Sequence, residues 1–104
     1  MLYSQKCIDI CMSILKDPIN LELSGQLIRS ATSVGANYRE ANESITKKSF
    51  YHIIGICRRE AKESKYWLEL LRYANSNQAG KITPVIDEAF QLTKIFASIG
   101  KKSK

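Results

Sequence analysis

Two carboxylates, Glu60 and Glu63, stand three residues apart within an otherwise apolar stripe of the sequence. Paired carboxylates perform general acid–base catalysis when they share one cleft and titrate at separated pKa values. Neither a nucleophile nor a phosphate-binding loop accompanies this pair, whereas Arg29 and Arg39 are available as counter-charges. A buried ion pair that fixes helix or subunit register explains the two carboxylates better than catalysis does. We therefore expect no catalytic residue and no enzyme.

The thiol and imidazole groups are few and poorly spaced for binding a metal ion. Cys7 and Cys11 are one helical turn apart, and the remaining candidates are Cys57 and the single His52. Zinc sites usually take four ligands, and His52 lies about 140° around its helix from Cys57. Cysteines at core positions usually behave as small hydrophobic residues. We expect no metal and no cofactor.

A third set of side chains combines cations with tyrosines at helical spacing between residues 48 and 73. Cationic groups attract phosphates and release their counterions, and aromatic rings stack on unpaired bases. The candidate nucleic-acid-binding residues are Lys48, Arg58, Arg59, Lys62, Lys65, Tyr66, Arg72 and Tyr73. The alternative is an exposed, solubilising face whose tyrosines cover a subunit contact. The sequence leaves both interpretations open.

The composition limits the class of protein that these residues serve. The chain of 104 residues suffices for one domain with a modest core. Its net charge of +6 fits a polyanionic partner, although many small proteins are basic without one. No stretch approaches the ~20 apolar residues that span a bilayer, no signal peptide is visible, and three cysteines do not suit a secreted disulfide scaffold. We expect a cytoplasmic protein with no membrane contact.

Four helices are expected to position these residues. Apolar periodicity predicts them at about residues 2–16, 21–43, 47–75 and 84–99, followed by a basic tail at 100–104. Pro18 ends the first helix, Thr46 is the expected N-cap of the third, and Thr83 with Pro84 opens the fourth. The residues predicted to face the core are Cys7, Ile8, Cys11, Ile14 and Leu15 in the first helix and Val85, Ile86, Ala89, Phe90, Leu92, Thr93, Phe96 and Ile99 in the fourth. The predicted fold is an all-α, antiparallel up-and-down four-helix bundle that forms a single domain over residues 1–104.

The third predicted helix carries two apolar stripes. The first is a heptad seam of Phe50, Ile54, Cys57, Ala61, Ser64, Leu68 and Leu71, and the second comprises Ile53, Ile56, Glu60, Glu63, Trp67, Leu70 and Ala74. Two stripes give two buried faces, one for the bundle and one for a neighbouring subunit. A wide helix face in a monomeric bundle would give a similar pattern. We expect a homo-oligomer.

Small residues fill the buried side of the second predicted helix, where Gly35 costs about 1 kcal/mol relative to alanine unless another backbone comes close. The motif there comprises Gln26, Leu27, Arg29, Ser30, Ala31, Ser33, Val34, Ala36, Asn37 and Glu40, and the third helix adds Phe50, Glu60, Ala61, Glu63, Tyr66 and Trp67. Over residues 23–71 this pattern resembles the four-helix-bundle family of 23S rRNA intervening sequence proteins. The chain departs from the pattern at Gly35, where many members carry proline, and at Tyr38, which replaces a small aliphatic residue.

The resemblance implies an antiparallel four-helix protomer that assembles as a ring-like homopentamer. The family name refers to insertions within ribosomal RNA genes of some bacteria and does not name an activity. A more distant branch serves as the accessory protein of diversity-generating retroelements, where a basic pentamer engages a reverse transcriptase and RNA. We expect the polar residues at motif positions, together with one further arginine, to form a structural cluster between helices or across subunits: Arg29, Asn37, Arg39, Glu40, Glu60 and Glu63.

The predicted function is that of a non-catalytic, basic oligomeric scaffold. It binds RNA or another nucleic acid through the lysine, arginine and tyrosine face and, by analogy, a protein partner such as a reverse transcriptase. The alternative is a structural protein–protein interaction module with no nucleic-acid role. A phosphate-dominated complex weakens steeply as salt rises and an apolar protein contact does not, so a salt series separates the two functions.

Overall fold

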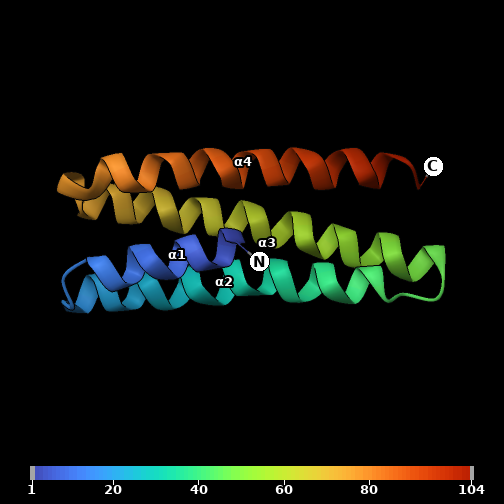
Figure 1. Ribbon diagram of the computed structural model, residues 1–104, viewed down its shortest axis with the longest axis horizontal. Coiled ribbons are helices and arrows are strands. Elements are labelled where there is room, and N and C mark those ends of the chain that lie inside the picture. The colour runs from blue at the N-terminus through green and yellow to red at the C-terminus, as the bar shows by residue number, and fades with distance from the viewer. Residues whose placement is uncertain (1, 104) are drawn as a thin grey trace.

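The computed structural model describes residues 2–103, which fold into four antiparallel α-helices (Figure 1). The helices are α1 (Leu2–Ser13), α2 (Pro18–Asn42), α3 (Lys47–Ala74) and α4 (Ala79–Lys101), and a 3₁₀ turn, η1 (Ser76–Gln78), leads into α4. None of the described residues lies in a strand. No helix within residues 2–103 has the length and apolarity needed to cross a bilayer. The prediction of an all-α four-helix bundle is confirmed.

The first residues of α2 and α3 are set by capping side chains. The Asp17 carboxylate accepts a backbone N–H of the first turn of α2 at 2.8 Å, and Pro18 stands where its missing N–H is not needed. For this reason α2 begins at Pro18 and not near residue 21 as predicted. The Thr46 hydroxyl accepts the Ser49 N–H at 3.1 Å, so Thr46 is the N-cap of α3, as predicted.

The start of α4 differs from the prediction, which placed it at Pro84 with Thr83 as its cap. The helix begins at Ala79, so Pro84 lies inside it, and the segment between the third and fourth predicted helices, residues 76–83, forms η1 and the beginning of α4. Ile82 is fully buried. Burying this side chain stabilises the added turn, which the loop-like composition of the segment did not indicate.

Two other helix ends also differ from the prediction. Helix α1 ends at Ser13, before the predicted residue 16, and α4 continues to Lys101 instead of ending at about residue 99. The helix therefore takes in the beginning of the predicted basic tail, of which residue 104 lies outside the described residues.

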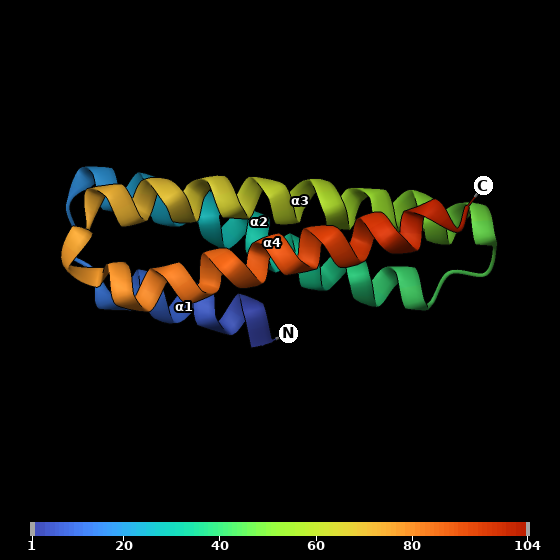
Figure 2. The same cartoon turned by 90° about the horizontal axis from the view of Figure 1, so that it is seen from above.

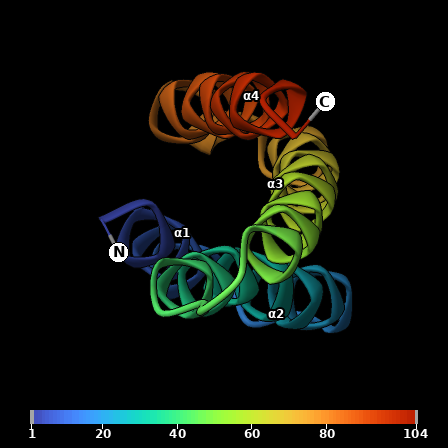
Figure 3. The same cartoon turned by 90° about the vertical axis from the view of Figure 1, so that its right-hand side faces the viewer.

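Helix α1 covers only about half of the bundle's length (Figure 2). In the view along the bundle, α3 lies between α2 and α4, and α1 lies beside α2 (Figure 3). The core accordingly forms two clusters, one that includes side chains of α1 and one built from α2, α3 and α4 alone. In the half without α1, Tyr38 of α2 packs on Phe96 of α4, with ring centroids 6.0 Å apart.

Both apolar stripes of α3 pack within the protomer. The heptad seam is buried from Ile54 to Leu71. The second stripe is half-buried over most of its length, and its Ile53 and Trp67 pack against the two core clusters. Part of the second stripe therefore packs inside the protomer, and its contact with a neighbouring subunit stays a prediction.

Three side chains predicted to face the core are exposed instead. The exposed fraction is 36% for Ile8, 78% for Leu15 and 48% for Phe90. Helix α1 turns Ile10 inward in place of Ile8, and Leu15 follows the end of α1 at Ser13, where the helical periodicity no longer applies.

Candidate nucleic-acid interface

Three cations surround a hollow on the exposed side of α3. Gly55, Arg58, Arg59 and Lys62 line this hollow, which has a volume of about 260 Å³. Residues three, four and seven positions apart share one side of a helix, so the three cationic side chains converge around the glycine. All three are exposed, and none forms an ion pair within residues 2–103. We call this group the basic hollow.

The other predicted cations of α3 do not join the basic hollow. Lys65 pairs with Glu69 at 3.5 Å, and Arg72 Nη1 donates to the Thr83 hydroxyl at 3.1 Å. Lys48 lies near the start of α3, where it lines a separate hollow that extends to Ser103. The predicted nucleic-acid face therefore has a central group of cations without partners, and its other cations either bond to a neighbouring side chain or lie far from this group.

Two tyrosines continue the outward side of α3 beyond the basic hollow. Tyr66 is 54% exposed and packs edge-on against Trp67, with ring centroids 5.0 Å apart. Tyr73 is 89% exposed. At positions four and eleven after Lys62, both rings lie on the same side of the helix as that lysine.

Two further lysines, Lys94 in α4 and Lys102 directly after it, add positive charge that was not predicted from the sequence. Lys94 Nζ lies 4.7 Å from the centroid of the Phe90 ring, which Lys65 Nζ approaches to 5.9 Å from α3. Lys102 shares the hollow at the start of α3 with Lys48. The periodicity of α3 alone could not reveal these neighbours, because they depend on the antiparallel register of α3 and α4.

The predicted polar cluster is assembled only in part. Arg29 Nη1 donates to Glu60 Oε2 at 3.4 Å, and Arg29 Nη2 pairs with Glu63 Oε1. The Trp67 indole N–H donates to the same Glu63 oxygen at 3.4 Å. Glu60 is nearly buried, with an exposed fraction of 7%. Because both carboxylates turn toward α2 and meet a cation there, they do not neutralise the basic hollow.

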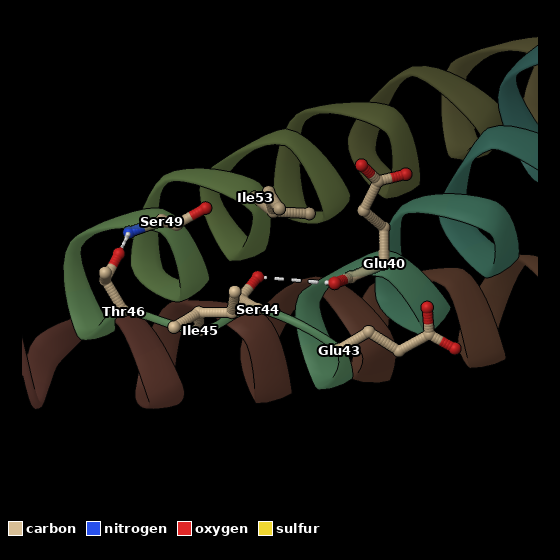
Figure 4. A pocket seen from close by; sticks show the side chains of 7 residues that line it. All are labelled: Glu40, Glu43, Ser44, Ile45, Thr46, Ser49 and Ile53. Carbon is tan, nitrogen blue, oxygen red and sulfur yellow. Dashed lines mark hydrogen bonds between the residues drawn. The ribbon is translucent and has the colours of Figure 1, made fainter.

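The remaining three members of that cluster lie elsewhere. Asn37 donates to the Ser33 carbonyl within α2, and Arg39 and Glu40 are exposed and form no ion pair in the described part of the chain. Glu40 lines a hollow at the turn from α2 to α3, together with the fully exposed Ile45 (Figure 4).

A second surface hollow, between α1 and α2, is almost entirely apolar. Five exposed aliphatic side chains surround Gly25 there, and the hollow has a volume of about 310 Å³. These side chains are Ile8, Met12, Leu15, Leu21 and Ile28. Lys16 is the one charged residue that lines it. We call this group the apolar hollow.

The comparison with known proteins places this fold and these helices in a family. The model of the 23S rRNA-intervening sequence protein family matches residues 2–98. The chain belongs to this family. A similar solved structure is the crystal structure of a protein with unknown function from the S23 ribosomal protein family of Bacteroides thetaiotaomicron. The two share 28% sequence identity with a TM-score of 0.71, over 95% of this chain and 98% of the other. No curated protein matches the chain.

The small residues of the 23S rRNA-intervening sequence motif lie where other helices come close. Ser30 and Ala31 are almost fully buried, and the Ala31 carbonyl accepts the Ser4 hydroxyl of α1 at 2.9 Å. Tyr3 of α1 reaches Ser64 of α3, with the two hydroxyl oxygens 2.6 Å apart. The small residues of the motif therefore allow α1 to pack closely on α2, while the Tyr3 side chain connects α1 to α3.

The thiols of this family member are buried in the core. Burial raises the pKa of Cys7 to about 12 and that of Cys57 to about 11, and it raises the pKa of Cys11 as well. All three are therefore protonated at neutral pH and are poor nucleophiles and ligands. Between residues 2 and 103, no three histidine, cysteine, aspartate or glutamate side chains come together as a metal-binding group.

Proposed function

We propose that this protein is a non-catalytic scaffold that binds RNA, or another nucleic acid, through the basic hollow. The observation that carries the proposal is the group of Arg58, Arg59 and Lys62, three exposed cations without a carboxylate partner in the described residues. Cations that are not already paired release counterions and gain affinity when they contact phosphates. The net charge of +6 adds a long-range attraction for a polyanion.

The scaffold that we propose is a homo-oligomer, in which the apolar hollow contacts a second copy of the chain. Of the thirteen large hydrophobic residues that are exposed between residues 2 and 103, seven fall within residues 2–28, and five of these seven line this hollow. A contiguous apolar patch of this kind is typical of a protein contact. The family resemblance supports a ring of five copies, which would repeat the basic hollow and strengthen RNA binding through avidity.

The apolar hollow also supports a second candidate function. A structural protein–protein interaction module without a nucleic-acid role would use this surface and leave the basic hollow to solvent. A scaffold that binds RNA alongside a protein partner, such as a reverse transcriptase, would use both hollows. We place either activity in the cytoplasm, where the buried thiols remain reduced.

The test of RNA binding is a charge reversal of the basic hollow. The triple variant Arg58→Glu, Arg59→Glu, Lys62→Glu should lose about 100-fold in affinity for a single-stranded RNA at about 0.1 M salt, because three phosphate contacts are removed. The slope of log affinity against log salt should fall by about 2. Fluorescence anisotropy with an RNA of about 16 nucleotides measures both quantities.

A matched control changes the net charge equally at three exposed cations outside the basic hollow: Arg39→Glu, Lys81→Glu and Lys101→Glu. This control should retain most of the affinity and most of the salt slope. Equal losses in the two triple variants would show that only the net charge matters. An unchanged affinity in the Arg58, Arg59 and Lys62 variant would refute the assignment of the site.

A further inference from the structure

No contact within the protomer explains why a glycine occupies position 55 in the middle of α3. A glycine within a helix is destabilising relative to alanine, because it loses more conformational entropy on folding. Such a residue is expected where a neighbouring backbone leaves no room for a side chain. At Gly55, however, an added Cβ would meet no atom within 4 Å beyond its chain neighbours and the adjoining backbone of its own helix. The packing of this protomer therefore does not require glycine at this position.

Because Gly55 has no side chain, the α3 backbone is uncovered at the base of the basic hollow. Arg58 and Arg59 lie one helical turn after the glycine and Lys62 lies two turns after it, so all three extend beside an uncovered stretch of α3 backbone. Glycine is the residue that lets a ligand approach the backbone closely. We infer that the basic hollow seats one phosphate group of the bound RNA strand against α3 at Gly55, with Arg58, Arg59 and Lys62 around it.

This inference rests on the proposed RNA-binding function and names the part of the ligand that occupies the hollow. Three cations around one small hollow favour a compact group with a high density of negative charge, and guanidinium groups match phosphate oxygens with paired hydrogen bonds. The neighbouring carboxylates, Glu60 and Glu63, are turned to Arg29 on α2. A phosphate in the hollow therefore meets cations without a competing acidic group beside it.

The tyrosines beyond the hollow favour a single-stranded RNA over a duplex. Tyr66 and Tyr73 follow Lys62 along α3 by about 6 Å and 16 Å, and both rings are exposed. Exposed aromatic rings stack on unpaired bases, whose faces a duplex keeps within its own stack. A strand whose phosphate sits at Gly55 can place the adjoining bases over these rings.

The experiment fills the hollow without changing its charge. Gly55→Leu places an aliphatic side chain, which is a good helix former, where the phosphate would sit. Because an added Cβ has room and leucine favours a helix more than glycine does, the melting temperature should rise. The affinity for single-stranded RNA should fall at least about fivefold at about 0.1 M salt through the loss of one phosphate contact. Gly55→Ala should show the same two changes with smaller size.

The matched control is Gly80→Leu, at an exposed glycine in the first turn of α4 that also has nothing within 4 Å of an added Cβ. Its affinity for RNA should equal that of the wild type. Suppose that Gly55→Leu is more stable and binds RNA as well as the wild type, while the triple charge reversal does not bind. The inferred phosphate position at Gly55 is then wrong, and the proposed function stands. If neither variant loses affinity, the phosphate position and the proposed function are both wrong.

A wild-type protein that binds a duplex of the same sequence more tightly than the strand would overturn the single-strand assignment.

Discussion

The apolar hollow on α1 and α2 and the basic hollow on α3 have the same floor and different rims. Each lies over an exposed glycine inside a long helix, Gly25 or Gly55, and an added Cβ at either glycine would meet nothing within 4 Å. The lining of the apolar hollow is mostly aliphatic, with Lys16 as its charged member and Asn20 and Ser24 as polar ones, and the rim of the basic hollow consists of arginines and a lysine. Both hollows lie over a bare glycine backbone, so under the proposed function the chemistry of the rim sets which kind of partner each hollow would bind.

The two rims lead to opposite responses to salt. Contacts between cations and phosphates weaken as salt rises, because the counterion release that drives them becomes less favourable. Burial of aliphatic surface does not depend on counterions and is strengthened by some salts. The comparison therefore predicts that the RNA complex and the protein oligomer come apart under different conditions.

The largest effect expected of a single substitution is on the apolar hollow. Leu15→Glu places a carboxylate among aliphatic side chains at a residue that is 78% exposed, so the fold of the protomer tolerates it. The oligomer should dissociate at least about 30-fold more readily, which is the loss expected at a central interface residue. Light scattering over a range of protein concentrations measures this change.

Ile45→Glu is the control for that variant. Ile45 is fully exposed at the turn from α2 to α3, outside the apolar hollow. Its substitution should leave the oligomer mass unchanged. Should Leu15→Glu also keep the wild-type mass at every concentration, the apolar hollow is not the contact with a second copy.

A smaller effect is expected at Arg29, which joins α2 of the apolar hollow to α3 of the basic hollow. Arg29→Ala leaves Glu60 nearly buried without its cation. Since the arginine side chain is about half exposed and partly screened by water, we expect a loss of about 1–3 kcal/mol in the free energy of unfolding. Urea denaturation measures it.

Glu60→Gln provides the comparison for Arg29→Ala, because an amide removes the buried charge and keeps a hydrogen-bonding oxygen near Arg29. This variant should be less destabilised than Arg29→Ala. An Arg29→Ala protein with the wild-type urea midpoint would mean that the ion pairs do not tie the two helices together.

The smallest expected effect is the pH dependence that Cys7 gives to α1. Burial raises the pKa of this thiol from 9.0 to about 12, so the folded state holds the proton more tightly than the unfolded state. The associated stability is complete below about pH 9 and is lost as pH rises toward 12, by about 1 kcal/mol between pH 9 and pH 10. Urea denaturation at these two values of pH measures the loss. Cys7→Ala should reduce it, and an identical loss in that variant would assign the alkaline sensitivity to other groups.

The periodicity of the sequence predicted the helices better than it predicted their exposed sides. The seam from Ile54 to Leu71 follows from a regular repeat on a long helix, and Thr46 from the chemistry of an N-cap. The early start of α4 at Ala79 did not follow, because the burial of Ile82 depends on the surrounding helices. The exposure of Leu15 did not follow either, because it depends on where α1 ends.

The candidate site likewise has features that the sequence predicted and features that it did not. The ion pairs of Arg29 with Glu60 and Glu63 were predictable, because carboxylates on an apolar stripe need a cation. The pairing of Lys65 with Glu69 and the hydrogen bond of Arg72 to Thr83 were not predictable, because water competes for both side chains at the surface. The basic hollow depends on which exposed cations have no partner in the folded protein, and helical spacing alone does not determine this.

One measurement tests the central claim that two hollows serve two partners. Protein purified without nuclease is passed through size-exclusion chromatography with light scattering at low and at high salt, and its nucleic-acid absorbance is recorded relative to that of protein. We predict an oligomer that carries RNA at low salt and, at high salt, an oligomer of the same protein mass without RNA. A monomer at both salt concentrations would contradict the role of the apolar hollow, and an oligomer free of RNA at low salt would contradict that of the basic hollow.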